Sequence, residues 1–315
     1  MSPPEWRVLV EDYLARRHDL GFAVEQLGWY LRDFARYTEQ TEHRGPLTVD
    51  LAVRWARSTR SGDPAHAERR LGAVRQFARY RAGFDPATEV APIGLLSRTP
   101  CRTQPHIYND AEISALLQEC RRLGPRGGLR PMTYGVFFSL LASTGLRLSE
   151  ACRLERRDVD LAHGVLTIRM SKFRKSRLVP LHPTSVQALT RYAARRDAVA
   201  PLSEFFFRTD QAPALKRSTV EGTFRTVRLR LGWTSQGRAR RPRIHDFRHT
   251  FAVRRLLRWY QDGVDLDRKI LALATYLGHT QVSHTYWYLS AVPELMAVTA
   301  QRFEHFAQPE RESAP

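Results

Sequence analysis

Eight residues late in the chain, RIHDFRHT at 243–250, combine two histidines, two arginines and an aspartate. If this stretch opens a helix, His245 and Arg248 project from one face because they are three residues apart. Arginine offers a planar pair of donors to a phosphate and histidine adds a hydrogen bond, so the stretch predicts an anion site. A metal site at His245 and His249 is disfavoured, because no acidic third ligand lies nearby and the arginines repel a dication.

Two further segments carry groups of the same kind. The segment STGLRLSEACRL places Arg147 two residues after Gly145, in a tight turn between two helices. The segment LGHTQVSHTYWYLS places His279 after a glycine and then gives an aromatic cluster at 286–288. Each segment is also compatible with a structural role, since TGLR suits an inter-helix turn and aromatic residues commonly pack in a core.

The first part of the chain is predicted to form a small all-helical domain. Apolar residues recur at helical spacing in four segments, within 6–14, 27–34, 49–57 and 65–80. The following segment shows little periodicity and contains Pro86, Pro92, Pro100 and Pro105, which is typical of a linker. We therefore expect an all-α domain over residues 1–85, a linker over 86–105 and a second domain over 106–315.

The second domain is predicted to be mostly helical with one β-hairpin. Asn109 or Asp110 is the expected N-cap of one helix, and TYGVFFSLLASTG predicts a buried helix that ends at Gly145. Between 164 and 182, apolar residues alternate on both sides of a polar turn, which predicts a hairpin with Lys172 and Lys175 at its tip. Helical patterns dominate again from residue 185 onward. The expected fold class is therefore mainly α with a small β-hairpin.

The 315-residue chain carries a net charge of +18 that is unevenly distributed. Residues 1–100 hold 15 arginines against 13 acids, whereas residues 101–315 hold 35 lysines and arginines against 19 acids. Such a surplus predicts a polyanionic partner, because neutralising phosphates releases counterions. Residues 225–258 contain 11 arginines and a single acid, Asp246, interleaved with apolar residues. That pattern favours a packed framework that presents arginines to nucleic acid over a solvated tail.

The remaining composition argues against several classes of protein. The three cysteines, Cys101, Cys120 and Cys152, have no metal-site spacing and are expected to be reduced thiols. No apolar run approaches the roughly 20 residues that span a bilayer, and the N-terminus has no signal-peptide pattern. There is no Walker motif and no carboxylate cluster for a metal. We expect a cytoplasmic, nucleoid-associated protein with no membrane partner, no metal and no other cofactor.

Five motifs follow one another along the chain. They are TGLR at Arg147, a hairpin lysine at Lys172, HxxRH at His245 and Arg248, LGH at His279, and a tyrosine nine residues later at Tyr288. In this order they resemble the tyrosine recombinase, or phage integrase, family over about residues 105–306. The resemblance implies two domains, an all-α core-binding domain followed by a mixed α/β, mostly helical catalytic domain.

The resemblance assigns catalytic roles to Arg147, Lys172, His245, Arg248, His279 and Tyr288, and a structural role to Glu150. It implies that the tyrosine attacks the scissile phosphate, which gives a 3′-phosphotyrosyl link and a free 5′-hydroxyl, without metal or ATP. Arg147 and Arg248 then bracket the non-bridging oxygens, with a hydrogen bond from His279. His245 is the candidate proton acceptor, and Lys172 is the candidate donor to the leaving oxygen.

The resemblance also implies partners. Double-stranded DNA is the expected substrate, and the candidate DNA contacts outside the catalytic set are Arg174, Lys175, Arg177, Arg240, Arg241 and Arg243. An apolar stripe between Leu295 and Phe306 suggests a terminal helix that packs into a neighbouring subunit of a tetramer on DNA. Docking of that helix on its own domain is the alternative.

The expected activity is site-specific recombination for integration or excision of a mobile element, with sister recombinases of the same element as further partners. Three alternatives stay open. One is an accessory DNA-binding factor that keeps the fold without exchanging strands, and another is a nuclease or topoisomerase that shares the tyrosine step. The third is an arginine-rich RNA-binding protein, which would not require Tyr288 or Lys172.

Overall fold

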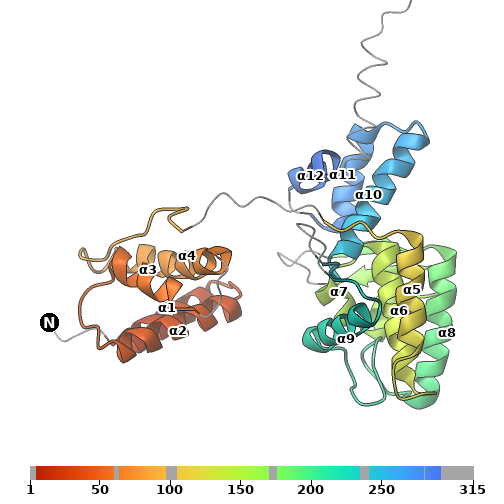
Figure 1. Ribbon diagram of the computed structural model, residues 1–315, viewed down its shortest axis with the longest axis horizontal. Helices are drawn as coiled ribbons and strands as arrows, with labels where there is room; N and C mark the ends of the chain where they lie inside the picture. The colour runs from red at the N-terminus through yellow and green to blue at the C-terminus, as the bar shows by residue number, and fades with distance from the viewer. Residues whose placement is uncertain are drawn as a thin grey trace, which may run out of the picture. The chain divides into compact units, whose positions relative to one another are not determined.

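The computed structural model describes residues 5–59, 64–96, 105–169, 176–234, 241–279 and 281–291. The chain forms two compact units that divide after Arg102. Figure 1 shows the order of the helices and strands in each unit. Within the described part of the chain, no helix is long and apolar enough to cross a membrane.

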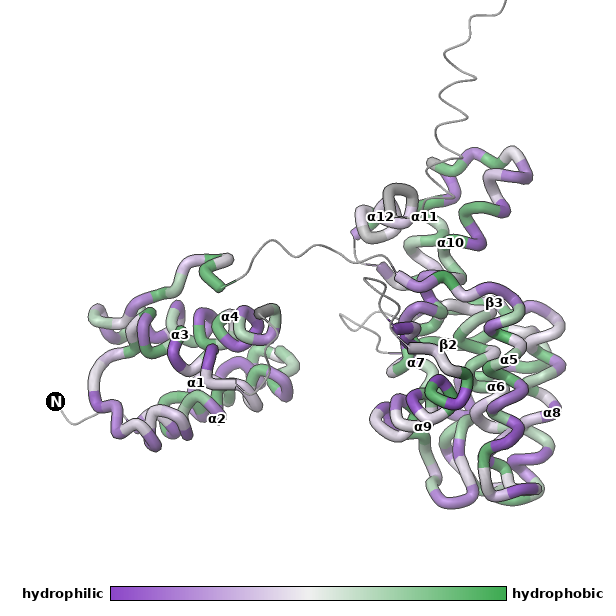
Figure 2. Tube along the Cα trace, viewed as in Figure 1, coloured by the Kyte–Doolittle hydropathy of each residue, from purple (hydrophilic) through white to green (hydrophobic). Residues whose placement is uncertain are grey.

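The described part of the first unit contains four helices, α1 (Trp6–Asp19), α2 (Glu25–Gln40), α3 (Val49–Arg57) and α4 (Pro64–Arg81). All four lie where the apolar periodicity predicts helices. Hydrophobic and hydrophilic residues alternate along them (Figure 2), so that each helix turns an apolar side inward. These sides meet in one core around Phe34, Trp55 and Phe77, whose side chains are fully buried.

Residues 86–96, expected to belong to a linker, instead pack on this first unit. Arg75 donates from Nε to the carbonyl oxygen of Ala91 (2.8 Å) and from Nη2 to that of Pro92 (2.9 Å). The Glu89 carboxylate accepts the first backbone N–H of α3 (2.7 Å). The prolines remove helical periodicity, but the carbonyl groups beside them serve as acceptors, so the segment is held in place without being helical.

The second unit is built around α6 (Leu129–Thr144), which packs against both α5 (Asp110–Arg121) and α8 (Pro183–Val199) (Figure 1). Apolar residues cover most sides of α6, as expected of a helix buried in a core. The helix ends as predicted at Gly145, where φ is 63° and a Cβ would lie 2.8 Å from the Phe251 ring. Glycine therefore allows both the left-handed turn and the close approach of the next layer.

A three-stranded antiparallel sheet has the order β1 (Val159–Asp160), β2 (Val165–Ile168) and β3 (Arg177–Pro180). A 3₁₀ turn at Arg156–Asp158 leads into β1, a strand too short to give a sequence pattern. The strands β2 and β3 form the predicted hairpin, with Val165 opposite Pro180 and Ile168 opposite Arg177. The predicted tip with Lys172 and Lys175 lies outside the described residues. A mainly α fold with a small sheet is confirmed.

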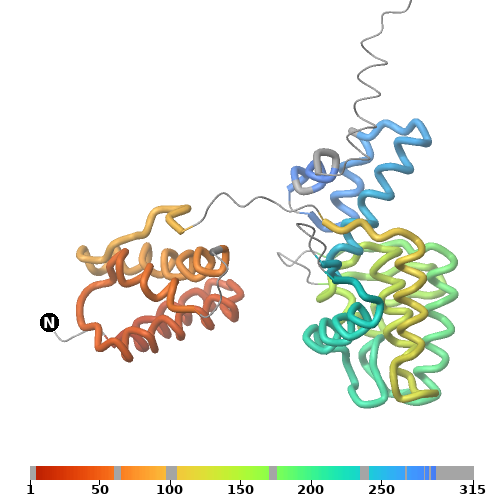
Figure 3. Tube along the Cα trace, viewed as in Figure 1, coloured from red at the N-terminus to blue at the C-terminus, as the bar shows by residue number. Residues whose placement is uncertain are grey.

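The remaining helices are α7 (Leu148–Cys152), α9 (Arg217–Arg230), α10 (Asp246–Gln261), α11 (Leu266–Leu277) and α12 (Ser283–Ala291). The last three pack on one another, as the blue part of the trace in Figure 3 shows, around Phe251, Leu256 and Leu273. Because α10 also packs on α6, it joins this cluster to the rest of the unit. This arrangement brings the TGLR, RIHDFRHT and LGH segments together.

Candidate active site

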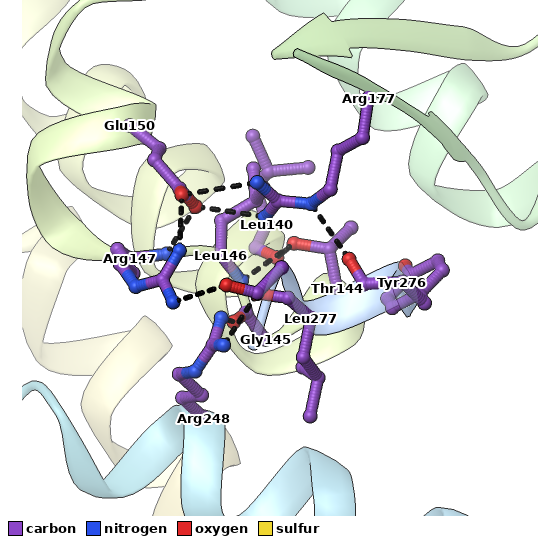
Figure 4. Close-up of polar contacts among 11 residues, drawn as sticks. Leu140, Thr144, Gly145, Leu146, Arg147, Glu150, Arg177, Arg248, Tyr276 and Leu277 are labelled. Atoms are coloured by element: carbon purple, nitrogen blue, oxygen red, sulfur yellow. Dashed lines mark hydrogen bonds and ion pairs between the residues drawn. The ribbon is translucent and has the colours of Figure 1, made fainter. Parts of the chain in front are cut away.

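Two arginines, Arg147 in the turn before α7 and Arg248 in α10, converge on the C-terminal ends of α6 and α11 (Figure 4). Arg147 donates from Nη2 to the Gly278 carbonyl oxygen (2.7 Å), and Arg248 donates from Nη2 to the neighbouring Leu277 carbonyl oxygen (2.5 Å). Arg248 also donates from Nη1 to the Gly145 carbonyl oxygen (2.8 Å). The last carbonyls of a helix lack intrahelical partners and carry partial negative charge, which stabilises cations. The backbone thus holds the two guanidinium groups close to one another.

Glu150, which is 3% exposed, binds Arg147 from the other side. Its carboxylate accepts hydrogen bonds from Nη1 and the backbone N–H of Arg147 (2.8 and 2.9 Å), and from both terminal nitrogens of Arg177 (3.0 and 2.9 Å). Burial acts to raise the pKa of Glu150, but the hydrogen bonds and charges of the two arginines outweigh it and hold the pKa at about 2. This geometry agrees with the structural role expected of Glu150.

Arg177, expected among the DNA contacts, is bound inside the protein. Its side chain is 10% exposed, pairs with Glu150 and donates from Nε to the Tyr276 carbonyl oxygen (2.7 Å). The guanidinium therefore ties β3 to α7 and α11, and the expectation of a DNA contact does not fit this geometry. The strand pattern located Arg177 at the foot of the hairpin but contained no information about which partners its long side chain reaches.

Gly278 makes the close approach of these arginines possible. Its φ is 66°, and a Cβ there would lie 2.9 Å from Nη1 of Arg177 and 3.3 Å from Nη1 of Arg147. Any other residue adds strain from the left-handed backbone and displaces a guanidinium group. The glycine of the LGH motif is thus required by the site itself.

Tyr288, in α12, is 2% exposed and lies against two histidines. Nδ1 of His249 lies 3.2 Å from the phenolic oxygen, and the His279 ring stacks on the tyrosine ring with centroids 6.4 Å apart. Burial raises the pKa of Tyr288, while the positive charges of Arg248 and Arg147 act in the opposite direction. The tyrosine therefore lies within electrostatic reach of both arginines.

The second predicted histidine is oriented by a buried neighbour on α12. Nδ1 of His279 lies 2.7 Å from the hydroxyl oxygen of Thr285, whose side chain is fully buried. A hydroxyl can donate to or accept from an imidazole nitrogen, so this contact orients the ring with either tautomer. His279 is thus a positioned group rather than a mobile side chain.

His245, the candidate proton acceptor, precedes α10 and is exposed to solvent. Desolvation by the surrounding protein and then the charge of Arg248 lower its pKa, which favours the neutral form. Among the described contacts, the tyrosine hydroxyl is bonded to His249 and not to His245. Sequence reasoning considered His249 only as a metal ligand, and no group of three metal-ligating side chains occurs among the residues that the structure describes.

A basic cleft opens beside Arg147 and His245, between α7, α9 and the chain that precedes α10. The further arginines that line it are Arg217, Arg225, Arg228, Arg241 and Arg243. Of the predicted DNA contacts, the last two therefore lie in this cleft, whereas Arg174, Lys175 and Arg240 lie outside the described residues, as does Lys172. The three arginines of α9 were not singled out from the sequence, although two of them belong to the basic stretch 225–258.

The charges in the cleft are only partly neutralised by the protein. Arg243 pairs with Asp246 (2.8 Å) and Arg217 with Glu221 (2.8 Å). Arg228 is 7% exposed, and in the described part of the chain no carboxylate pairs with it. Burial, followed by the charge of a neighbouring arginine, lowers its pKa. The cleft therefore carries positive charge that the described carboxylates do not fully neutralise.

Comparison with known proteins identifies the class to which this site belongs. The sequence pattern of the phage integrase family matches residues 108–294. The chain is 39% identical over 307 residues to the proposed integrase/recombinase y4rB of Sinorhizobium fredii, covering 95% of this chain and 97% of that protein. It is 30% identical over 268 residues to the tyrosine recombinase XerC of Myxococcus xanthus, covering 82% and 83%. The chain belongs to the phage integrase family.

Solved structures agree on the fold. The chain is similar to the Tn1549 transposon integrase in complex with transposon right-end DNA, with a TM-score of 0.67 at 16% identity, covering 98% of this chain and 100% of that one. It is also similar to the XerH site-specific recombinase bound to its difH substrate, with a TM-score of 0.64 at 17% identity, covering 94% and 84%. The tyrosine recombinase fold is confirmed, and with the family it makes this protein a site-specific recombinase.

Proposed function

We propose that Tyr288 is the nucleophile of this recombinase and that Arg147 and Arg248 hold the scissile phosphate. The observation that carries the proposal is the anchoring of both guanidinium groups on successive carbonyls, Leu277 and Gly278, within electrostatic reach of the tyrosine. A guanidinium has five N–H donors, so these contacts fix its orientation and leave other donors for the non-bridging oxygens of a phosphate. In comparable oxyanion sites, losing one donor costs about 10²–10³ in rate.

In this proposal the Tyr288 oxygen attacks phosphorus, a 3′-phosphotyrosyl bond forms and the 5′ oxygen leaves. The charge that develops on the phosphate is met by arginines that are already in place, so little reorganisation is needed. Lys172, outside the described residues, is the proposed proton donor to the 5′ oxygen. Lys172 belongs to the segment that joins β2 to β3, two strands that pair with each other. The hydrogen bonds from Arg177, the first residue of β3, to Glu150 hold this end of the hairpin beside the site, which supports the role.

The two predicted histidines are assigned to the phosphate. We take the Thr285 hydroxyl as the donor to Nδ1 of His279, which leaves the imidazole proton on Nε2 and makes that nitrogen a donor to a non-bridging oxygen. His245 lines the basic cleft beside Arg147, and this position favours a hydrogen bond to the phosphate over a contact with the tyrosine.

We further propose that the basic cleft binds the backbone of double-stranded DNA. Arg241 and Arg243 line it, and a buried arginine without a carboxylate partner, Arg228, is stabilised when an anion supplies the missing charge. Arg174, Lys175 and Arg240 remain proposed contacts from the same resemblance. Contacts of this kind hold DNA in register without reading its sequence.

Assembly and biological role are proposed on the same basis. Relatives of similar fold include a lambda integrase dimer bound to a core site and the integrase bound to a transposon end. We propose that this chain acts as a tetramer on DNA at the nucleoid, linked by the segment with Leu295 and Phe306, to integrate or excise a mobile element. Sister recombinases of the same element are proposed partners.

A covalent-trapping assay tests the proposed nucleophile. The protein is incubated with nicked suicide duplexes tiled from the DNA that flanks its gene, and adducts are resolved on denaturing gels. We expect a protease-sensitive adduct from the wild type and from Tyr286→Phe, the matched control with an exposed ring two residues away, but none from Tyr288→Phe. An adduct that persists in Tyr288→Phe refutes the assignment. DNA binding without any adduct supports an accessory factor instead.

A further inference from the structure

The hydroxyl of Tyr288 has a partner to which the resemblance assigns no catalytic role. Nδ1 of His249 lies 3.2 Å from the phenolic oxygen, with the two rings inclined at 64° and their centroids 5.5 Å apart. The ring of His245 lies 4.8 Å from that of His249, centroid to centroid, and no contact of His245 with Tyr288 is among those described. Of the two histidines, it is thus His249 that contacts the phenolic oxygen, and not His245, to which the resemblance assigns the proton.

We propose that His249, and not His245, accepts the proton of Tyr288 when the strand is cut. This proposal rests on the assignment of Tyr288 as the nucleophile. In the cleavage step the phenolic proton moves to Nδ1 of His249 while the tyrosine oxygen forms its bond to phosphorus. The bond from phosphorus to the 5′ oxygen breaks, and that oxygen takes a proton from Lys172. In the joining step both protons return along the same routes.

The environment of His249 keeps the imidazole neutral before DNA binds. Burial lowers its pKa to about 3, and the groups that add to this effect are His245, Arg243, Arg248 and His279. The imidazole is therefore neutral near pH 7 and, with its proton on Nε2, presents the lone pair of Nδ1 to the phenol. A bound phosphodiester brings a negative charge among these cations, which raises the basicity of His249 at the moment when the proton must move.

A purely structural role makes a different prediction. If His249 only holds the phenol in place, any side chain that accepts the same hydrogen bond should suffice. Asparagine places a carbonyl oxygen near the position of Nδ1 but does not take up a proton at neutral pH. His249→Asn therefore separates positioning from proton transfer, and His245→Asn is the matched control one helical turn away.

The test is the single-turnover rate of adduct formation on the nicked suicide duplex, with either tyrosine or 3-fluorotyrosine at position 288. Fluorine makes the phenol more acidic, so an enzyme that lacks its proton acceptor gains more from it than one that lacks another group. We expect His249→Asn to slow adduct formation about 10²-fold and 3-fluorotyrosine to recover much of that loss. The deficit of His245→Asn should be the same with either phenol. His249→Gln is measured in parallel, so that misfolding of one variant does not decide the result.

The following results overturn the proposal. If His249→Asn forms the adduct at the wild-type rate, His249 at most positions the tyrosine. If 3-fluorotyrosine does not recover the slower rate of His249→Asn, His249 is not the proton acceptor. Recovery of His245→Asn instead restores the resemblance-based assignment. If the wild type forms no adduct, or Tyr288→Phe still forms one, the nucleophile itself is misassigned and the role of His249 fails with it, a result that no histidine variant can imitate.

Discussion

Replacing Glu150 with glutamine tests whether the two arginines that it binds depend on its charge. Their hydrogen bonds and charges lower the pKa of the buried carboxyl from 4.5 to about 2. One pKa unit corresponds to about 1.4 kcal/mol, so the ionised form is favoured in the folded protein by about 3 kcal/mol. Glutamine has the same shape but no charge, and it leaves Arg147 and Arg177 buried with a weaker acceptor. We expect the second unit to lose about 3 kcal/mol of unfolding free energy at neutral pH.

Hydrogen exchange of the slowest amides in α6, read by mass spectrometry on the intact chain, measures this loss. Those amides report the opening of the second unit alone, so the two units need not unfold together. The matched control is Glu221→Gln, which removes an exposed carboxylate 2.8 Å from Arg217 on the same unit. An exposed pair of this kind contributes about 0.5 kcal/mol or less.

The pH dependence gives a second check with a definite sign. Because the folded pKa of Glu150 lies below the unfolded one, its contribution is complete above about pH 4.5 and is lost as the pH falls towards about 2. The difference between wild type and Glu150→Gln should therefore shrink by about 1 kcal/mol when the exchange experiment moves from pH 7 to pH 4. A loss at pH 7 no larger than that of Glu221→Gln, or one that is unchanged at pH 4, would refute this reasoning.

Three further variants probe other parts of the site. Gly278→Ala pushes a Cβ to 2.9 Å from Arg177, and we expect about 10²-fold slower cleavage; wild-type single-turnover cleavage would show that the turn relaxes. Thr285→Val removes the 2.7 Å contact that orients His279. Cleavage should slow about 10-fold while duplex affinity is unchanged, and a wild-type cleavage rate would show that other contacts hold His279. Arg241→Ala should reduce the slope of log K against log salt in DNA binding by about 1, and an unchanged slope removes this residue from the interface.

Helix bounds and caps could be predicted from local sequence patterns. The third helix covers Val49–Arg57 as its periodicity predicts. The apolar α6 stops at Gly145, which takes the left-handed conformation that ends the helix. The predicted N-cap also holds, because the Asn109 side chain accepts the Glu112 N–H (2.8 Å) and the Glu112 carboxylate accepts the Asn109 N–H. Periodicity and capping act within a few residues, so one sequence contains them in full.

Contacts between distant segments did not follow in the same way. Arg147 meets Gly278, 131 residues further along the chain, and nothing in either segment states that the partner is a carbonyl oxygen. The side chain of Arg177 is held inside the protein because it binds the buried Glu150, a contact that the strand pattern does not predict. The resemblance assigned roles from the order of residues in its motifs, which contains no distances, so it did not indicate the contact of His249 with Tyr288.

Both arginines of the proposed site are held by backbone carbonyl oxygens, at Gly145, Leu277 and Gly278, and Arg147 is held by the Glu150 side chain as well. A substitution at position 277 therefore changes the core around the anchor without deleting the acceptor, whereas a Cβ at Gly145 or Gly278 is strained and displaces a neighbouring side chain. The cleft proposed to bind the DNA backbone belongs to other segments, α9 and the chain before α10. In directed evolution of DNA affinity, libraries can accordingly randomise that surface while the turns at 145 and 278 are kept constant, so that backbone contacts vary and the anchors of the two arginines are kept.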